Sequence, residues 1–271
     1  DTVLSRGLGD VYKRQINLLS LIIKNGRFIN EPLLDSSSTI SFFFKSKISQ
    51  SNNLKLLPGI LKTTTLGYDG KGQIRLNNKN EIDQHKIDFN NQYILEKIIN
   101  LKKEISVIIT RFKNQTYEIY EPIENIHKDQ ILKFSEIPAK ISSDILNLST
   151  EWAKKISEEL DYVGTLCVEY FIDENDNLYV NEIAPRVHNS GHLTINSHNV
   201  SQFENHIRAV CALDKLETKK IYNAKMINLI GEDITEYRNK KVKENEFFFD
   251  YQKKEIKPKR KMGHFLSLIH I

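Results

Sequence analysis

Hydrophobic and polar residues alternate along several short stretches of the chain, and this pattern predicts β-strands with one covered face. Strands are expected at residues 93–100, 104–112, 115–122, 165–172 and 178–184. Apolar residues recur at helical spacing in 142–160, and residues 201–213 also have the pattern of a helix. Residues 224–264 are expected to form short strands joined by basic turns. Hairpins without regular helical crossovers predict an α+β fold.

A glycine-rich loop lies in the stretch PGILKTTTLGYDGKGQIRLN at residues 58–77. Loops of this kind let backbone N–H groups approach phosphate oxygens. The spacing excludes a Walker loop and a dinucleotide-binding fingerprint, since both open a helix, whereas extended residues flank this loop on both sides. We therefore predict the tip of a β-hairpin that covers a nucleotide. A glycine-rich surface hairpin without a ligand is the alternative.

Size and composition narrow the class of protein. The 271 residues are 39% hydrophobic and 27% charged, which is typical of a soluble globular protein with two or three compact units. The net charge of +4 is spread along the chain and gives no argument for nucleic acid. Cys167 and Cys211 both lie in apolar contexts, which favours a reducing cytoplasm over a disulfide framework. The apolar run at 16–23 is too short to span a bilayer.

The two ends of the chain differ from the rest. Residues 1–15, DTVLSRGLGDVYKRQ, and residues 267–271, SLIHI, resemble translated sequencing-adapter tails. Both are expected to be non-native, and the natural protein is expected to extend beyond both ends. Neither end is included in the expected fold.

Two carboxylates lie close together in the hairpin predicted at 165–184. Symmetric pairing about its turn puts Glu169 opposite Asn181, one position from Glu182. Two carboxylates and an amide oxygen form the oxygen-rich site that Mg²⁺ prefers. A surface hairpin with two solvated glutamates is the alternative, but the otherwise apolar strands favour the metal.

Two further segments carry clustered polar side chains. The stretch APRVHNSGH at 184–192 has Gly191 for a sharp turn, and its polar residues suit an anionic group. These residues are Arg186, His188, Asn189, Ser190 and His192. A purely structural role for His188 is the alternative. The stretch YQKKEIKPKRKMGH at 251–264 holds six Lys and Arg side chains, which form either a solvated face or a second anion site.

Several of these stretches resemble the 5-(carboxyamino)imidazole ribonucleotide synthases, a family of ATP-grasp enzymes, in order and spacing. They are KTTTLGYDGKGQ, GTLCVEYF with YVNEIAPRVHNSGH, SQFENHIRAV, MINLIGED and KKEIKPKRKMGH. The similarity covers about residues 20–266, and the NEIAPR-x-HNSGH run is highly specific. It implies an ATP-grasp fold of two α+β lobes that grip ATP, followed by a small C-terminal β-rich domain. The expected spans are 16–93 for the small lobe, 94–213 for the large lobe and 214–266 for the last domain.

The resemblance also assigns roles to individual residues. The ATP-binding residues would be Lys62, Gly67, Tyr68, Asp69, Gly70, Lys71, Gly72, Gln73, Glu96, Lys97, Ile98, Ile99, Glu104, His127, Asn181 and Glu182. Arg186, His188, Asn189, Ser190 and Lys71 would be catalytic, at the bicarbonate and carboxyphosphate site. Tyr68, Asp69, Lys253 and Arg260 would bind the ribonucleotide, and Glu169, Glu182 and Asn181 would bind Mg²⁺. The chain departs from the family at Leu66 and Lys259, where glycine is usual, and at Leu193, where tryptophan is common.

The activity implied by the resemblance is an ATP-dependent carboxylation of 5-aminoimidazole ribonucleotide with bicarbonate in purine biosynthesis. It would use ATP and Mg²⁺ without biotin. The full-length enzyme would be a cytoplasmic homodimer that binds small molecules and neither nucleic acid nor membrane. Two alternatives stay open: another ATP-grasp ligase, such as formate-dependent glycinamide ribonucleotide transformylase or biotin carboxylase, and an inactive nucleotide-binding fragment that lacks the family's N-terminal domain.

Overall fold

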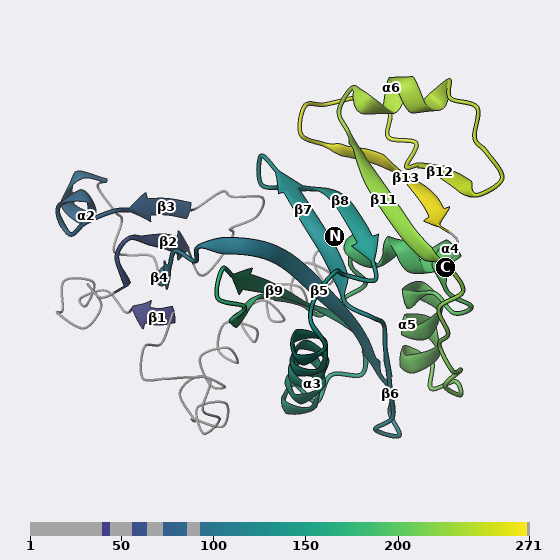
Figure 1. Cartoon of the computed structure of the whole chain (residues 1–271), viewed down its shortest axis with the longest axis horizontal. Coiled ribbons are helices and arrows are strands. Elements are labelled where there is room, and N and C mark those ends of the chain that lie inside the picture. The colour runs from purple at the N-terminus through teal and green to yellow at the C-terminus, as the bar shows by residue number, and fades with distance from the viewer. Residues whose placement is uncertain (1–39, 44–55, 64–72, 86–92, 270–271) are drawn as a thin grey trace, which may run out of the picture. The chain divides into compact units, whose positions relative to one another are not determined.

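The structure is a computed structural model, and it describes residues 40–43, 56–63, 73–85 and 93–269 (Figure 1). The chain divides into two compact units, Asp1–Ile99 and Asn100–Ile271. Among the described residues, no helix combines the length and the hydropathy needed to cross a membrane.

The described part of the first unit is a four-stranded antiparallel sheet with strand order β1-β4-β2-β3. Its elements are β1 (Ile40–Phe43), β2 (Gly59–Thr63), β3 (Gln73–Leu76), α2 (Asn80–Gln84) and β4 (Tyr93–Lys97). The strands β2 and β3 pair with Lys62 opposite Gln73, so the two arms of the predicted glycine hairpin are confirmed. The predicted boundary between residues 93 and 94 falls at the start of β4, which pairs with β1 and β2 in the first unit.

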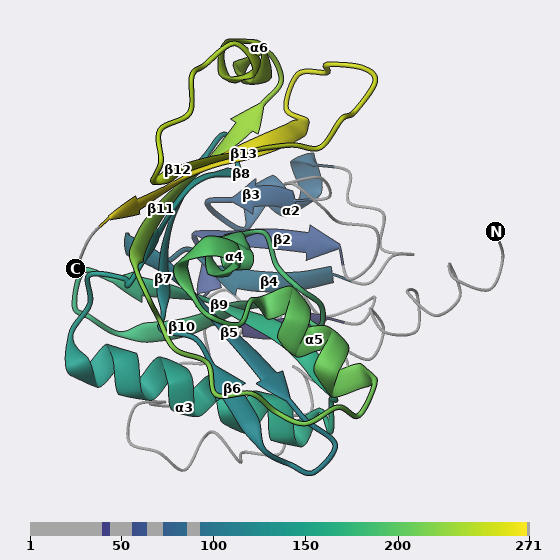
Figure 2. The ribbon, with the colours of Figure 1, turned by 90° about the vertical axis from the view of Figure 1, so that its right-hand side faces the viewer.

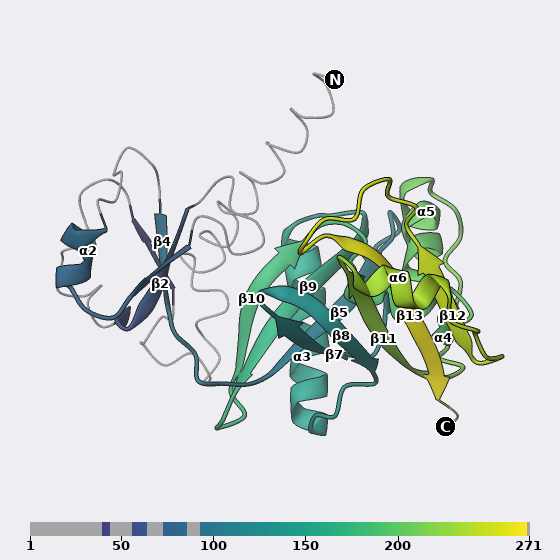
Figure 3. The same ribbon diagram turned by 90° about the horizontal axis from the view of Figure 1, so that it is seen from above.

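The second unit is built on a nine-stranded antiparallel sheet with strand order β10-β9-β5-β7-β8-β11-β13-β12, in which β6 pairs with β5 beside this path (Figures 1 and 3). The strands are β5 (Leu101–Arg111), β6 (Tyr117–Ile119), β7 (Ile123–Lys128), β8 (Ile131–Ile137), β9 (Gly164–Asp173), β10 (Leu178–Ala184), β11 (Asn223–Ile230), β12 (Glu246–Asp250) and β13 (Lys261–Ile269). Because β11 pairs with β8, the C-terminal strands continue the sheet of the large lobe.

Helices cover both faces of this sheet (Figure 2). They are α3 (Ser143–Glu159), the 3₁₀ turn η2 (Ser190–Leu193), α4 (Thr194–Ser197), α5 (Gln202–Val210) and α6 (Asp233–Arg238). The serines that precede α3 and α5 cap them, because each hydroxyl accepts a hydrogen bond from a backbone N–H in the first turn. Both predicted long helices are confirmed.

The core beneath η2 joins the large lobe to the C-terminal strands. It is a cluster of buried side chains contributed by β5, β7, β8, β9, β10, β11, β13 and η2, among them Ile108, Cys167, Ala184, Leu193, Met226 and Leu266. Leu193, where the resemblance led us to expect tryptophan, is fully buried in this cluster. The loop that ends in η2 is thereby anchored on one face of the sheet.

Three parts of the second unit differ from the pattern-based expectations. The strands β7 and β8 were not predicted, because polar residues such as Asn125 and Ser135 occupy inward positions in them. The helix α6 lies within a region expected to hold strands alone. Residues 267–269, which were left out of the expected fold, continue β13, and Ile269 pairs with Asn223.

Candidate active site

The hairpin of β9 and β10 brings two carboxylates together. Glu169 pairs directly with Glu182, and directly paired residues project from the same face of an antiparallel sheet. The predicted pairing of Glu169 with Asn181 is wrong, because symmetric counting about the turn assumes an unbroken ladder. The ladder shifts between Val180 and Glu182, so Asn181 is the extra residue of a β-bulge. Asn181 and Glu182 therefore both oppose the single residue Glu169.

Burial and a neighbouring negative charge both raise the pKa of Glu169. Burial, together with the negative charge of Glu182, raises the pKa of Glu169 to about 7, although His127 acts in the opposite direction. A cation bound between the two carboxylates would relieve both effects. Carboxylate and amide oxygens are also the ligands that Mg²⁺ prefers. The donor set of Glu169, Glu182 and Asn181 therefore fits a Mg²⁺ ion.

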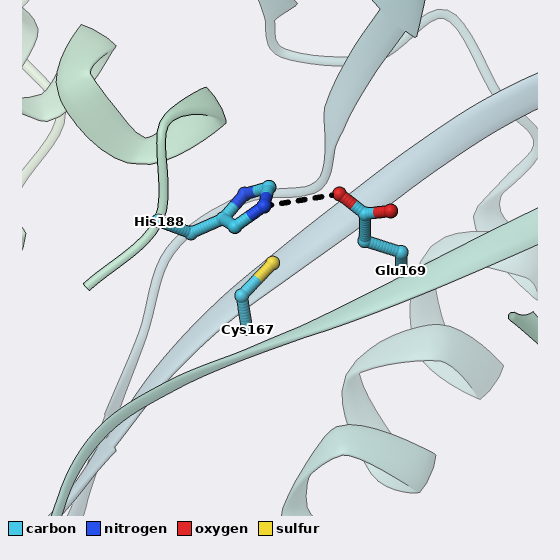
Figure 4. A group of neighbouring side chains, drawn as sticks. All are labelled: Cys167, Glu169 and His188. Atoms are coloured by element: carbon cyan, nitrogen blue, oxygen red, sulfur yellow. Dashed lines mark ion pairs between the residues drawn. The ribbon is translucent and has the colours of Figure 1, made fainter. Parts of the chain in front are cut away.

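The imidazole of His188 faces Glu169 from the loop that follows β10 (Figure 4). Its Nε2 lies 3.2 Å from Oε1 of Glu169, and the ligand atoms of Cys167, Glu169 and His188 all lie within 4.8 Å of one another. Burial, reinforced by the charge of Arg186, lowers the pKa of His188 to about 3. The ring is therefore neutral at physiological pH, and it meets Glu169 as a hydrogen-bonding group.

Gln202, the first residue of α5, holds the backbone of this loop. Its side-chain amide donates to the carbonyl oxygen of His188 at 2.7 Å and accepts from the backbone N–H of His188 at 2.9 Å. Gln202 is fully buried. A Cβ atom at Gly191 would lie 2.4 Å from Oε1 of Gln202, so glycine is required there for close packing.

We expect Gly191→Ala to destabilise the chain by about 1–3 kcal/mol, because the added methyl group pushes Gln202 away from the backbone of His188. Chemical denaturation measures the change in the free energy of unfolding. In a Gln202→Ala background the same substitution should cost clearly less, since the obstructing amide is gone. An equal cost in both backgrounds would contradict this packing argument.

Other residues predicted in the loop are also held in place. Asn189 accepts a hydrogen bond at Oδ1 from Nδ2 of Asn228 on β11 at 2.6 Å, and Ser190 is buried with its Oγ 2.8 Å from Nδ1 of His188. Arg186 is exposed, and its Nη1 donates to the carbonyl oxygen of Val187 at 3.0 Å. The loop thus presents a cation and neutral hydrogen-bonding groups beside the carboxylate pair.

Glu104 on β5 and His127 on β7, both predicted to bind nucleotide, form an ion pair with 2.6 Å between Oε2 and Nδ1. Burial alone would lower the pKa of His127, but the adjacent Glu104, aided by Glu169, raises it above its ordinary value. This pair is therefore electrostatically linked to the proposed metal ligands.

The basic segment after β12 is a loop, as its proline predicts. Lys253 donates from Nζ to the carbonyl oxygen of Lys261 at 2.5 Å, and Arg260 is exposed. Burial and the nearby charge of Arg260 lower the pKa of Lys253, so the loop holds two neighbouring cations. Lys259 has a φ of 62°, a left-handed conformation that favours glycine, the residue that the resemblance led us to expect at this position.

In the first unit, Nζ of Lys62 on β2 lies 2.5 Å from Oε2 of Glu96 on β4. Both side chains are about a quarter exposed, at 26% and 23%. Lys97 ends β4, Ile98 and Ile99 follow it, and Gln73 begins β3. The loop residues predicted to cover the nucleotide, from Gly67 to Gly72 and including Tyr68, Asp69 and Lys71, lie outside the described residues.

Several buried polar residues around the site were not predicted. They are Ser106, Asn125, Ser135, Gln202 and Asn228. A polar side chain at an inward position of an otherwise apolar strand could have indicated the residues on strands. Gln202 lies in the motif SQFENHIRAV, but no role was assigned to it.

The family model of the ATP-grasp domain matches residues 43–203, and that of the phosphoribosylaminoimidazole carboxylase C-terminal domain matches residues 224–268. The chain therefore belongs to the ATP-grasp family, and the predicted fold class is confirmed. Within this family its relatives are N5-carboxyaminoimidazole ribonucleotide synthases, which confirms the resemblance. It is 40% identical over 223 residues to the enzyme of Bacillus subtilis, a match that covers 81% of this chain and 58% of that protein.

Solved structures give the same result. The Staphylococcus aureus N5-carboxyaminoimidazole synthetase complexed with ADP is 35% identical with a TM-score of 0.75, and the match covers 86% of this chain and 63% of that one. The Aspergillus clavatus synthase in complex with ADP and 5-aminoimidazole ribonucleotide is 30% identical with a TM-score of 0.69, and the match covers 78% of this chain and 57% of that one. The chain thus spans less than two thirds of the length of these relatives.

Proposed function

We propose that the protein to which this chain belongs carboxylates 5-aminoimidazole ribonucleotide with bicarbonate and ATP, and releases ADP and phosphate. The observation that carries the proposal is the Glu169–Glu182 pair with His188 beside it, in a chain related to N5-carboxyaminoimidazole ribonucleotide synthases. The reaction is proposed for the whole protein, in which the chain is extended to the length of these relatives. As a cytoplasmic homodimer, that protein would bind small molecules and no nucleic acid.

The chemistry explains why such a site needs both cations and a closed environment. Bicarbonate is a poor electrophile, so one of its oxygens first attacks the γ-phosphorus of ATP, and ADP leaves. The amine of the ribonucleotide then attacks the carbonyl carbon of the resulting carboxyphosphate, phosphate leaves, and the amine loses a proton. A bound Mg²⁺ would neutralise charge on the phosphoryl oxygens. Water must be kept from carboxyphosphate, which suits a covering glycine hairpin.

Each group of residues has a part in this scheme. Glu169 and Glu182, with Asn181, would hold the metal. Arg186 would neutralise the carboxyphosphate, and His188, Asn189 and Ser190 would orient it. Lys253 and Arg260 would bind the phosphate of the ribonucleotide.

The test measures ADP release by the whole protein with bicarbonate and 5-aminoimidazole ribonucleotide, each omitted in turn. We expect ADP release to require the ribonucleotide and bicarbonate together. Release that instead requires formate with glycinamide ribonucleotide, or biotin with bicarbonate, would identify another ATP-grasp ligase. Nucleotide binding without any turnover would favour a binding module.

We expect Lys62→Ala to weaken ATP binding about tenfold or more, since a charge-assisted contact to phosphate contributes roughly 1.5–3 kcal/mol. Titration calorimetry of the whole protein measures the dissociation constant, and thermal unfolding checks that the fold survives. Lys79→Ala, which removes an exposed lysine of the same unit, is the control and should bind ATP normally. Unchanged ATP affinity in Lys62→Ala would remove this lysine from the nucleotide site.

A further inference from the structure

A line of buried polar side chains connects the interior of the sheet to His188. Oγ of Ser135 on β8 donates to Oδ1 of Asn125 on β7 at 2.9 Å, and Nδ2 of Asn125 donates to Oγ of Ser106 on β5 at 2.9 Å. Oγ of Ser106 lies 2.8 Å from Oγ of Ser190, which lies 2.8 Å from Nδ1 of His188. Ser106 and Ser190 are fully buried, and Asn125 and Ser135 are 4% and 2% exposed. These four side chains, which end at His188, form a polar relay.

Asn125 favours one direction for the polar relay. An amide nitrogen only donates, so Ser106 accepts from Asn125 and keeps its own hydroxyl proton for a bond to Ser190. In that arrangement Ser190 accepts from Ser106 and its own proton is available to Nδ1 of His188. Nδ1 is then an acceptor, and the proton of the neutral ring is on Nε2.

A second contact favours the same tautomer and does not depend on Asn125. The backbone N–H of Ser190 lies 3.4 Å from Nδ1 of His188, and a backbone N–H can only donate. Two donors, one from the backbone and one from a side chain, therefore converge on Nδ1. The opposite ring nitrogen, Nε2, is the atom that faces Glu169 at 3.2 Å (Figure 4).

We propose that Ser106, Asn125 and Ser135 are positioning residues that hold His188 as the Nε2–H tautomer, so that Nε2 is a fixed hydrogen-bond donor at the carboxylate pair and not a base. In the reaction this N–H would donate to an oxygen of bicarbonate or carboxyphosphate and help to orient it. That role rests on the proposed function, whereas the tautomer rests on the hydrogen bonds alone.

The tautomer is tested by ¹⁵N NMR of the histidine-labelled chain at pH 8 without divalent cations. The chain has eight histidines, so the resonances of His188 are assigned by their loss in His188→Gln. The expected spectrum has an unprotonated Nδ1 and a protonated Nε2. A dominant Nδ1–H form in the native chain would overturn the proposal.

The relay is tested by Asn125→Asp, which keeps the size of the side chain but replaces the amide donor by an acceptor. An ionised carboxylate only accepts, so at pH 8 Ser106 should donate to residue 125, the direction of the relay should reverse, and the Nδ1–H form of His188 should increase. Ser149→Ala is the matched control, because Ser149 is a fully buried serine whose Oγ donates to the carbonyl oxygen of Leu146, outside the relay. A folded Asn125→Asp chain with an unchanged tautomer would overturn the role of the relay.

Activity of the whole protein separates this proposal from the proposed function. Asn125→Asp should lower kcat about 10–100-fold, as loss of an outer hydrogen-bonding partner does, while the KM for ATP changes little. Ser149→Ala should leave both constants unchanged. If the native protein carboxylates nothing but His188 has the expected tautomer, the proposed function fails and the assignment of the relay stands. A native kcat in Asn125→Asp despite an altered tautomer would overturn the proposed role of the Nε2–H tautomer in the reaction.

Discussion

Glu169→Gln and Glu182→Gln are each expected to abolish carboxylation by the whole protein. Glutamine keeps the volume of the side chain but removes a negative charge from a site where two directly paired carboxylates would hold Mg²⁺. The loss of activity should exceed the roughly 100-fold that removal of an outer partner of a metal site causes. Initial rates of ADP release at several Mg²⁺ concentrations measure it.

Glu174→Gln is the matched control, because Glu174 is an exposed glutamate in the turn of the same hairpin. It should retain native activity at every Mg²⁺ concentration. Near-native rates in both Glu169→Gln and Glu182→Gln at limiting Mg²⁺ would make the hairpin purely structural.

The free energy of unfolding of Glu169→Gln at neutral pH should rise relative to the native chain, although its activity falls. Burial and the charge of Glu182 raise the pKa of Glu169 to about 7 in the fold, against 4.5 as its ordinary value. Without divalent cations, the folded chain therefore keeps a proton that the unfolded chain loses, and its free energy of unfolding falls as pH rises from 4.5 to 7. Denaturation at several pH values should show a smaller fall in Glu169→Gln than in the native chain, and the same fall in both would contradict the assigned pKa.

Arg260→Ala should raise the KM for 5-aminoimidazole ribonucleotide roughly tenfold to hundredfold, since a charge-assisted contact to phosphate contributes about 1.5–3 kcal/mol. Arg260 is exposed, and its charge adds to the effect of burial in lowering the pKa of Lys253, so the two cations interact with each other. The contact is remote from the reacting amine in the proposed scheme. The KM for ATP should therefore barely change.

Steady-state kinetics of the whole protein with each substrate varied in turn measures both constants. Lys243→Ala removes an exposed lysine elsewhere in the second unit and should leave both unchanged. A raised KM for ATP with an unaffected ribonucleotide constant would assign the basic loop to the nucleotide instead.

Much of the fold follows from hydrophobic periodicity. The helices α3 and α5, the hairpin of β9 and β10, and the arms of the glycine hairpin are all where the pattern predicts them. Alternation fails where polar side chains face a site instead of solvent. Asn125 and Ser135 are buried in β7 and β8 for that reason, and those strands were missed. Glu169 and Glu182 could be predicted from their motif, but the polar relay joins residues far apart in sequence, and no local pattern indicates it.

The β-bulge at Asn181 determines which insertions and deletions the hairpin can tolerate. Neighbouring residues of a regular strand project to opposite faces, so a regular ladder with this sequence would set Glu182 against Val168 and turn it toward the apolar side of the sheet. An insertion in β10 between the bulge and Glu182 would have the same effect, whereas deletion of Asn181 would leave Glu182 opposite Glu169 and remove only the amide. Length variation in this strand is therefore confined to Asn181, the residue that would add a third oxygen ligand to the two carboxylates in the proposed metal site.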